Sequence, residues 1–176
     1  MTPPRIPLRD LVVSAIAELE QDRLESAQSL LTQAVEAAPH EPVPLYLLGT
    51  VLYRRGLYID AEPLFRRALD ISPGQPDTCF HLAQTLRVLK RPAEAIHFCG
   101  QALHSRPGFT EAALELAQAQ TEMGALAEAE QEYRRLLSHT FNLTAVLKLT
   151  TLLNQRDSFS ESETILRQSL RVLEHV

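Results

Sequence analysis

The sequence predicts an all-α protein built from repeated pairs of antiparallel helices, with no β-strand. Three observations predict this class. A pattern of large, small and helix-breaking residues recurs along the 176 residues with a period of 34. Within each period the apolar residues follow helical spacing. Ten of the eleven prolines lie outside the expected helices or at their starts, where proline disturbs a helix least.

The pattern is clearest between residues 42 and 75. In order, it consists of Leu45, Leu48, Gly49, Leu52, Gly56, Ala61, Phe65, Ala68 and Pro73. This order resembles the tetratricopeptide repeat (TPR), a helix–turn–helix unit. The resemblance implies a right-handed superhelical solenoid of about ten antiparallel helices, in which the first helix of each pair lines the concave face.

The same frame divides the chain into five units that we expect to form one domain. The domain covers residues 1–176, with repeats at about 8–41, 42–75, 76–109, 110–142 and 143–176. Ser14 and Glu18 are polar at expected apolar positions of the first unit. Lys90 replaces the turn glycine of the third unit, and Phe141 replaces the proline that closes the fourth. One such unit cannot bury its own apolar face, so the units must stack.

The fifth unit departs furthest from the pattern. Its turn position is Asp157. Its second helix is expected to pack through Ser162, Leu166, Ser169 and Leu170. This last helix is apolar and has neither a stop signal nor a polar cap, although solenoids usually need a polar terminal cap. We therefore expect either a chain that continues beyond Val176 or a last helix that another copy covers.

Glycine and proline inside the expected helices need a reason. Gly49 and Gly100 should each cost about 1 kcal/mol relative to alanine. The frame gives Gly49 a packing role, because small residues at its position let two helix backbones approach closely. It gives Gly100 none. Pro63 is expected within the first turn of a helix that begins near Ile59 or Asp60, where proline is tolerated.

Composition and motifs argue against several classes of function. The net charge is −5 and the chain has no basic run, so nucleic-acid binding is not expected. No stretch approaches the roughly 18 apolar residues of a membrane span. No secretory leader is recognisable. Two cysteines, Cys79 and Cys99, are too few for a disulfide framework and are expected to be buried. We expect a cytoplasmic protein.

The search for catalytic and metal sites is negative. The sequence contains no phosphate-binding loop, no dinucleotide fingerprint, no zinc-protease motif and no hydrolase nucleophile elbow. His97 and His104 lie two helical turns apart, which is too far to share an ion. We therefore expect no enzyme activity, no cofactor and no metal.

The resemblance places binding residues on the first helices. The expected set is Val12, Ile16, Tyr46, Thr50, Tyr53, Arg54, Phe80, Gln84, Arg87, Leu114, Gln118 and Leu147. One residue from each unit forms an apolar stripe that would hold an extended peptide or an amphipathic helix. Arg54 and Arg87 would bind a carboxylate or a carbonyl, and the glutamines would bind peptide amides. Apolar residues at this position are also typical of repeats in which they are half-buried against the neighbouring unit and bind no ligand.

Two well-known ligand sites of the family are not expected. The clamp that binds the carboxylate of chaperone tails needs two cations where this chain has Glu111 and Glu115. The asparagine ladder of the sugar-transferase superhelix occupies a row that reads Val13, Leu47, His81, Glu115 and Lys148. The partner of this chain must therefore differ in chemistry from both ligands.

We predict a scaffold that binds a protein segment in its concave groove. Two alternatives remain open. The chain could be an N-terminal regulatory or substrate-docking region of a larger transferase or hydroxylase, and the rest of the reading frame would show this. It could also be a self-assembly scaffold that forms a homodimer through the last helix. Changing Leu170 and Leu173 to glutamate would test that alternative by the mass in solution.

Overall fold

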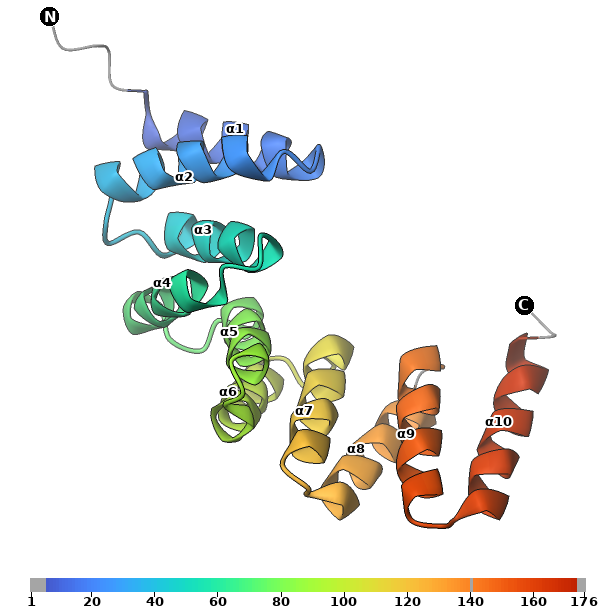
Figure 1. The fold of residues 1–176 in the computed structure, drawn as a ribbon. Helices are drawn as coiled ribbons and strands as arrows, with labels where there is room; N and C mark the ends of the chain where they lie inside the picture. The colour runs from blue at the N-terminus through green and yellow to red at the C-terminus, as the bar shows by residue number, and fades with distance from the viewer. Residues whose placement is uncertain (1–5, 140, 174–176) are drawn as a thin grey trace, which may run out of the picture.

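A computed structural model describes residues 6–139 and 141–173 of the chain. Within these ranges the chain forms ten α-helices and no strand (Figure 1). The helices are α1 (Leu8–Glu20), α2 (Leu24–Ala37), α3 (Pro42–Arg54), α4 (Tyr58–Ile71), α5 (Pro76–Val88), α6 (Pro92–Ser105), α7 (Thr110–Glu122), α8 (Leu126–His139), α9 (Leu143–Gln155) and α10 (Phe159–Leu173). The predicted all-α solenoid is confirmed.

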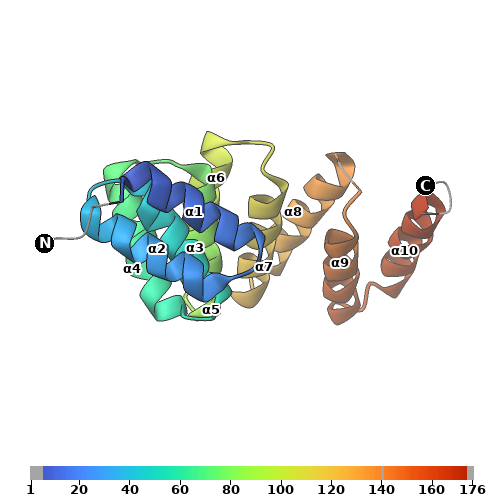
Figure 2. The ribbon, with the colours of Figure 1, turned by 90° about the horizontal axis from the view of Figure 1, so that it is seen from above.

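Consecutive helices pair and the pairs stack, so the chain forms an extended curve rather than a ball (Figures 1 and 2). The helices α3, α5 and α7 lie on the inner side of the curve, and α4, α6 and α8 lie on its outer side (Figure 1). We call the inner side the concave face. No helix in the described part of the chain has the length and apolarity needed to cross a membrane.

The turn inside each helix pair has the same conformation in all five units. The residues at this position are Asp22, Gly56, Lys90, Gly124 and Asp157, with φ angles of 56°, 78°, 62°, 81° and 58°. A left-handed conformation costs a residue other than glycine about 1–2 kcal/mol. Three units therefore adopt this turn without glycine, which indicates that helix packing imposes it.

Small residues allow close helix contact at the positions that the frame predicts. A Cβ atom added to Gly49 on α3 would lie 2.8 Å from Cε1 of Phe65 on α4. Phe65 is fully buried, so its ring has little room to move. A Cβ atom on Gly100 would meet nothing within 4 Å. Gly49 is thus required by packing, whereas Gly100 is not.

These two glycines provide a matched pair of substitutions. Gly49→Ala is expected to destabilise the protein by about 1–2 kcal/mol, because overpacking outweighs the gain in helix propensity. Gly100→Ala is expected to stabilise it by up to about 1 kcal/mol. Urea denaturation followed by circular dichroism measures both changes. An equal shift of the two midpoints would contradict the close contact between α3 and α4.

The expected position of Pro63 is wrong by part of a turn. The helix α4 begins at Tyr58, one residue before the earliest predicted start. Pro63 is therefore the sixth helical residue, beyond the first turn, and cannot donate the hydrogen bond that the carbonyl of Ile59 would accept. Ile59 is highly exposed, so water can reach this carbonyl.

The packing expected for the last helix is correct only in part. Ser162 is buried and Ile165 packs against the core of the last two units. Leu166 and Leu170 are exposed instead of buried. In the second unit, Phe65 stands at the position of Leu166. It lies between its own helix pair and the next one, in contact with Gly49 and His81. The described chain has no helix pair beyond α10.

Candidate functional site

The five residues of the predicted apolar stripe differ in how far they are exposed. Val12, Tyr46, Phe80 and Leu114 are partly buried, whereas Leu147 is exposed. The ring of Phe80 lies 5.1 Å from the ring of Phe109, the last residue of the third unit, directly before α7. Phe80 therefore packs at the boundary between the third and fourth units, against the cluster of Cys79, Ala102, Phe109 and Ala112, and only part of its surface is open to a ligand.

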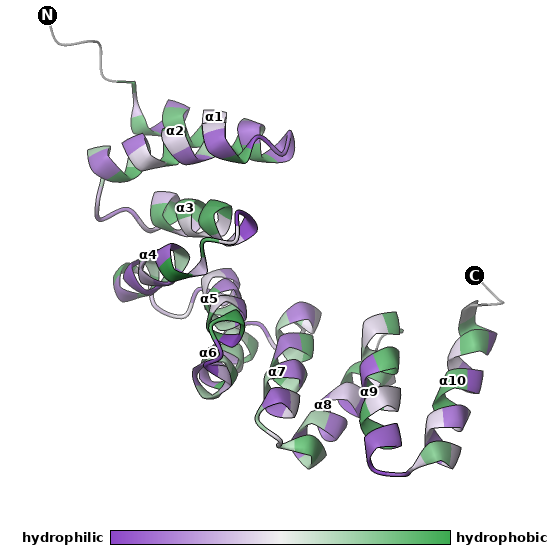
Figure 3. Cartoon of the chain, viewed as in Figure 1, coloured by the Kyte–Doolittle hydropathy of each residue, from purple (hydrophilic) through white to green (hydrophobic). Residues whose placement is uncertain are grey.

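Exposed apolar residues of the first helices lie on α1 and α3 as well as on α9. Val13 and Val43 are 58% and 54% exposed, and Ile16 is also exposed. With the half-buried Tyr46 and Leu47, these three residues form what we call the apolar patch. Hydrophobic segments alternate with paler ones along α3 (Figure 3). Val13, Val43 and Leu47 were missed as binding residues, although the frame places them on the first helices.

An aromatic cluster adjoins the apolar patch, and His81 on α5 is its centre. The ring centroid of His81 lies 5.5 Å from Tyr46 and 6.5 Å from Tyr53, both in edge-on arrangements. It also stacks on Phe65 at 5.9 Å. Tyr53 in turn lies 5.3 Å from Tyr58. The cluster joins the second unit to the third, and two of its three tyrosines, Tyr46 and Tyr53, belong to the predicted binding set.

The hydrogen bond of His81 fixes which ring nitrogen carries a proton. Nδ1 lies 2.8 Å from the backbone carbonyl oxygen of Asp77. A carbonyl oxygen can only accept, so Nδ1 donates and Nε2 keeps its lone pair. Burial lowers the pKa of His81, which favours the neutral ring. His81 therefore offers an acceptor and no charge.

Both arginines of the predicted set bind carboxylates of their own chain. Arg54 donates to Asp22 in the first unit at 2.7 Å. Arg87 donates to Glu115, which is only 4% exposed, and to Glu122 at 2.8 Å. Burial opposes the charge of Arg87, but these two acceptors outweigh it and raise its pKa. Both arginines are thus already bonded within the chain. The structure therefore gives no support to the prediction that they bind a carboxylate of a partner.

The polar residues of the predicted set are less informative. The hydroxyl of Thr50 donates to the carbonyl of Tyr46 on the preceding turn at 2.9 Å. Gln84 and Gln118 are half-buried. A hydroxyl that bonds its own helix adds no strong ligand contact. Contacts of the glutamines with peptide amides remain a prediction.

Cys79 and Cys99 are buried and unpaired, as predicted. Burial raises the pKa of the Cys79 thiol to about 11. Burial also raises the pKa of Cys99. A thiol in this state is a poor nucleophile at neutral pH. The two cysteines therefore belong to the core and not to a reactive site.

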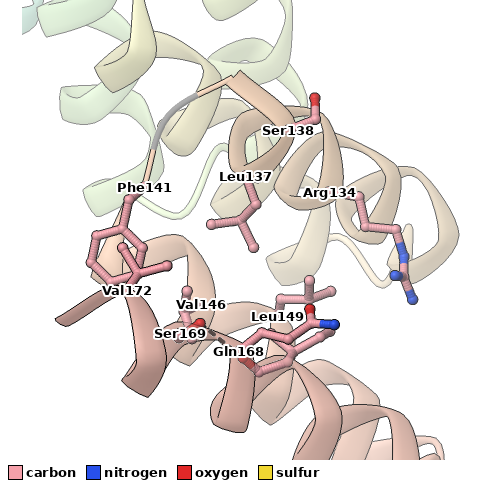
Figure 4. A pocket seen from close by; sticks show the side chains of 10 residues that line it. Arg134, Leu137, Ser138, Phe141, Val146, Leu149, Gln168, Ser169 and Val172 are labelled. Atoms are coloured by element: carbon pink, nitrogen blue, oxygen red, sulfur yellow. Dashed lines mark hydrogen bonds between the residues drawn. The ribbon is translucent and has the colours of Figure 1, made fainter. Parts of the chain in front are cut away.

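A cleft of about 560 Å³ opens between α8, α9 and α10 (Figure 4). Apolar side chains dominate its lining, among them Leu137, Phe141 and Val172. Arg134 lies at its edge and is already paired with Glu130 and Glu161. The cleft lies where Phe141 takes the place of the expected proline. Three of its polar side chains, those of Arg134, Ser138 and Ser169, already form hydrogen bonds within the chain, so it is a weaker candidate than the concave face.

Two sequence models of the tetratricopeptide repeat match the chain, at residues 13–76 and at residues 89–153. The chain is 34% identical over 95 residues to the inactive TPR repeat-containing thioredoxin TTL3 of Arabidopsis thaliana, which covers 54% of this chain and 13% of that protein. It is 28% identical over 160 residues to the probable coatomer subunit epsilon of Schizosaccharomyces pombe, which covers 87% of this chain and 54% of that protein. The chain spans at most about half the length of these curated relatives.

Solved structures show the same fold at low sequence identity. MamA from Desulfovibrio magneticus RS-1 aligns with a TM-score of 0.89 and 15% identity over 96% of each chain. YrrB, described as a TPR protein with an unusual peptide-binding site, aligns with a TM-score of 0.79 and 18% identity over 92% of this chain and 84% of its own. At this level of identity the likeness concerns the fold alone.

Proposed function

This chain belongs to the tetratricopeptide repeat family, and we propose that it is a non-catalytic scaffold that binds a peptide or helical segment along its concave face. Scaffolds for protein interaction are typical of the family. The apolar patch on α1 and α3 is the observation that carries the finer proposal. Val13 and Val43 expose more than half of their surface, and apolar residues gathered on one face mark an interaction site.

The form of the face favours a segment over a small molecule. It extends over the inner helices of an open curve rather than around a closed cavity (Figure 1), and small ligands prefer enclosed pockets. Amphipathic helices and extended peptides bind through apolar side chains spaced along one face. We include in the proposal that residues 1–176 fold as one domain. A cytoplasmic location is also part of it, supported by two unpaired cysteines.

Substitution of one exposed residue tests the proposal without disturbing the core. Val43→Asp is expected to weaken binding of peptides selected from a random library on this protein by about tenfold or more, because it places a carboxylate in the apolar patch. The matched control is Ile59→Asp on α4, because Ile59 is 77% exposed on an outer helix. Isothermal titration calorimetry measures both affinities. Equal losses in the two variants would contradict binding on the concave face.

Self-assembly is a second candidate, and α10 supplies the observation for it. Phe159, Leu166, Leu170 and Val172 on this helix are exposed. The side chain of Leu173, which the sequence also suggested for this test, lies outside the described residues. If assembly uses α10, light scattering over a concentration series shows a dimer that becomes a monomer in the double variant Leu166→Glu/Leu170→Glu. A monomer at every concentration excludes this function.

A further inference from the structure

The centre of the concave face combines aromatic rings with an excess of carboxylates. The rings are those of Tyr46, Tyr53 and His81, described above. Both tyrosines are only partly buried, so a ligand can reach them. Aromatic faces attract cations through their quadrupole, more strongly than they attract neutral polar groups.

The carboxylates around this cluster outnumber the cations. Helices α5 and α7 hold four carboxylates, Asp77, Glu111, Glu115 and Glu122, but only one guanidinium, that of Arg87. Arg106 at the end of α6 adds a second guanidinium and donates to Asp77 at 2.7 Å. Asp77 is paired with Arg106, and Glu115 and Glu122 share Arg87. Four negative charges against two positive charges still leave a local charge of −2.

These charges act on the tyrosines of the cluster. Burial raises the pKa of Tyr46, and the charge of Asp77 raises it further. Burial likewise raises the pKa of Tyr53, and the charge of Glu115 adds to this effect. The guanidinium of Arg106 opposes this effect on the pKa of Tyr46, and that of Arg87 opposes it on the pKa of Tyr53. Each phenol thus lies near an ion pair formed by the next units. The remaining polar group of the cluster, Nε2 of His81, is an acceptor.

Glu122 pairs with Arg87 through Oε1, and about a third of its side chain is exposed. The accessible rings and the excess of carboxylates together suit a positively charged donor. We propose that the segment bound on the concave face carries an arginine or lysine, whose side chain lies against Tyr46 and Tyr53 and within reach of Glu122 while the apolar residues of the segment cover the apolar patch. The inference rests on the proposed function and specifies the partner: an apolar segment with a cationic residue beyond its apolar stretch.

A peptide series tests this specificity. Each helical peptide of about 18 residues has leucines spaced along one face to match an apolar groove. A single variable residue is scanned over the following three turns as arginine, as citrulline or as glutamate. Citrulline keeps the shape of arginine without its charge. We expect the best arginine peptide to bind about tenfold more tightly than its citrulline form at low salt, and the glutamate form to bind more weakly than both.

Protein variants locate the effect. Glu122→Gln and Tyr53→Leu should reduce the arginine-to-citrulline ratio to about two, because they remove a charge and a ring respectively. Tyr53→Phe keeps the ring and should keep the ratio. The control Glu163→Gln should also keep it, since Glu163 is on α10 and pairs with Arg167.

Each outcome decides between the two proposals. Equal affinities of the arginine and citrulline peptides at every position would overturn the inference and leave peptide binding intact. Tighter binding of the glutamate peptides would overturn it as well. If none of the peptides binds, and library selection also yields no ligand, the proposed function itself fails.

Discussion

Phe65→Ala is expected to lower the free energy of unfolding by about 4 kcal/mol, the largest effect of any single change discussed for this chain. Phe65 is fully buried. Its ring lies against Gly49 within its own unit and stacks on His81 of the next unit. Truncation would leave a cavity among α3, α4 and α5, which cannot close unless these helices move together.

Urea denaturation of the variant measures this loss. Phe159→Ala is a suitable control, because Phe159 also belongs to a second helix but is 60% exposed. Its loss should stay below about 0.5 kcal/mol. Similar losses in the two variants would mean that Phe65 does not hold the second and third units together.

Arg87→Leu is expected to cost about 3 kcal/mol, because it leaves the carboxylate of Glu115 buried without a cation. Glu115 is on α7 and Arg87 on α5, so their contact joins the third unit to the fourth. The double variant Arg87→Leu/Glu115→Leu removes both charges. It should recover most of the lost stability, because apolar residues can replace a buried ion pair at little cost.

The comparison with Glu122 separates burial from charge. Glu122 also pairs with Arg87, but about a third of its side chain is exposed. Glu122→Gln should therefore cost well under 1 kcal/mol. The single variant Glu115→Leu completes the comparison. If the loss of stability in the double variant equals the sum of the losses in Arg87→Leu and Glu115→Leu, the pair is not coupled and its role in joining the units is wrong.

The sequence predicted the fold well because packing between helices repeats with each unit. The buried residues Leu45, Ala61 and Phe65 all stand at frame positions that were expected to be apolar or small. The turn position also kept its conformation where the glycine was lost, as at Lys90. A periodic pattern identifies these residues because each unit repeats the same neighbours.

The candidate site was predicted less completely. His81 and Glu115 belong to a row that was considered only for two ligand sites known in the family, the asparagine ladder and the carboxylate clamp. Their roles depend on single partners, the Asp77 carbonyl and Arg87, and no periodic rule specifies such partners. Val13 and Val43 were missed for a related reason. Their exposure depends on the distance between neighbouring first helices. The apolar pattern of a single helix does not predict that distance.

Amide chemical shifts of the isotope-labelled protein, recorded while a library-selected peptide is added, test the central claim most directly. Binding along the concave face predicts that the largest changes fall on α1, α3 and α5, around Val13, Val43 and His81. The outer helices α2, α4 and α6 should change little. Changes concentrated on those outer helices, with the apolar patch unaffected, would contradict the account.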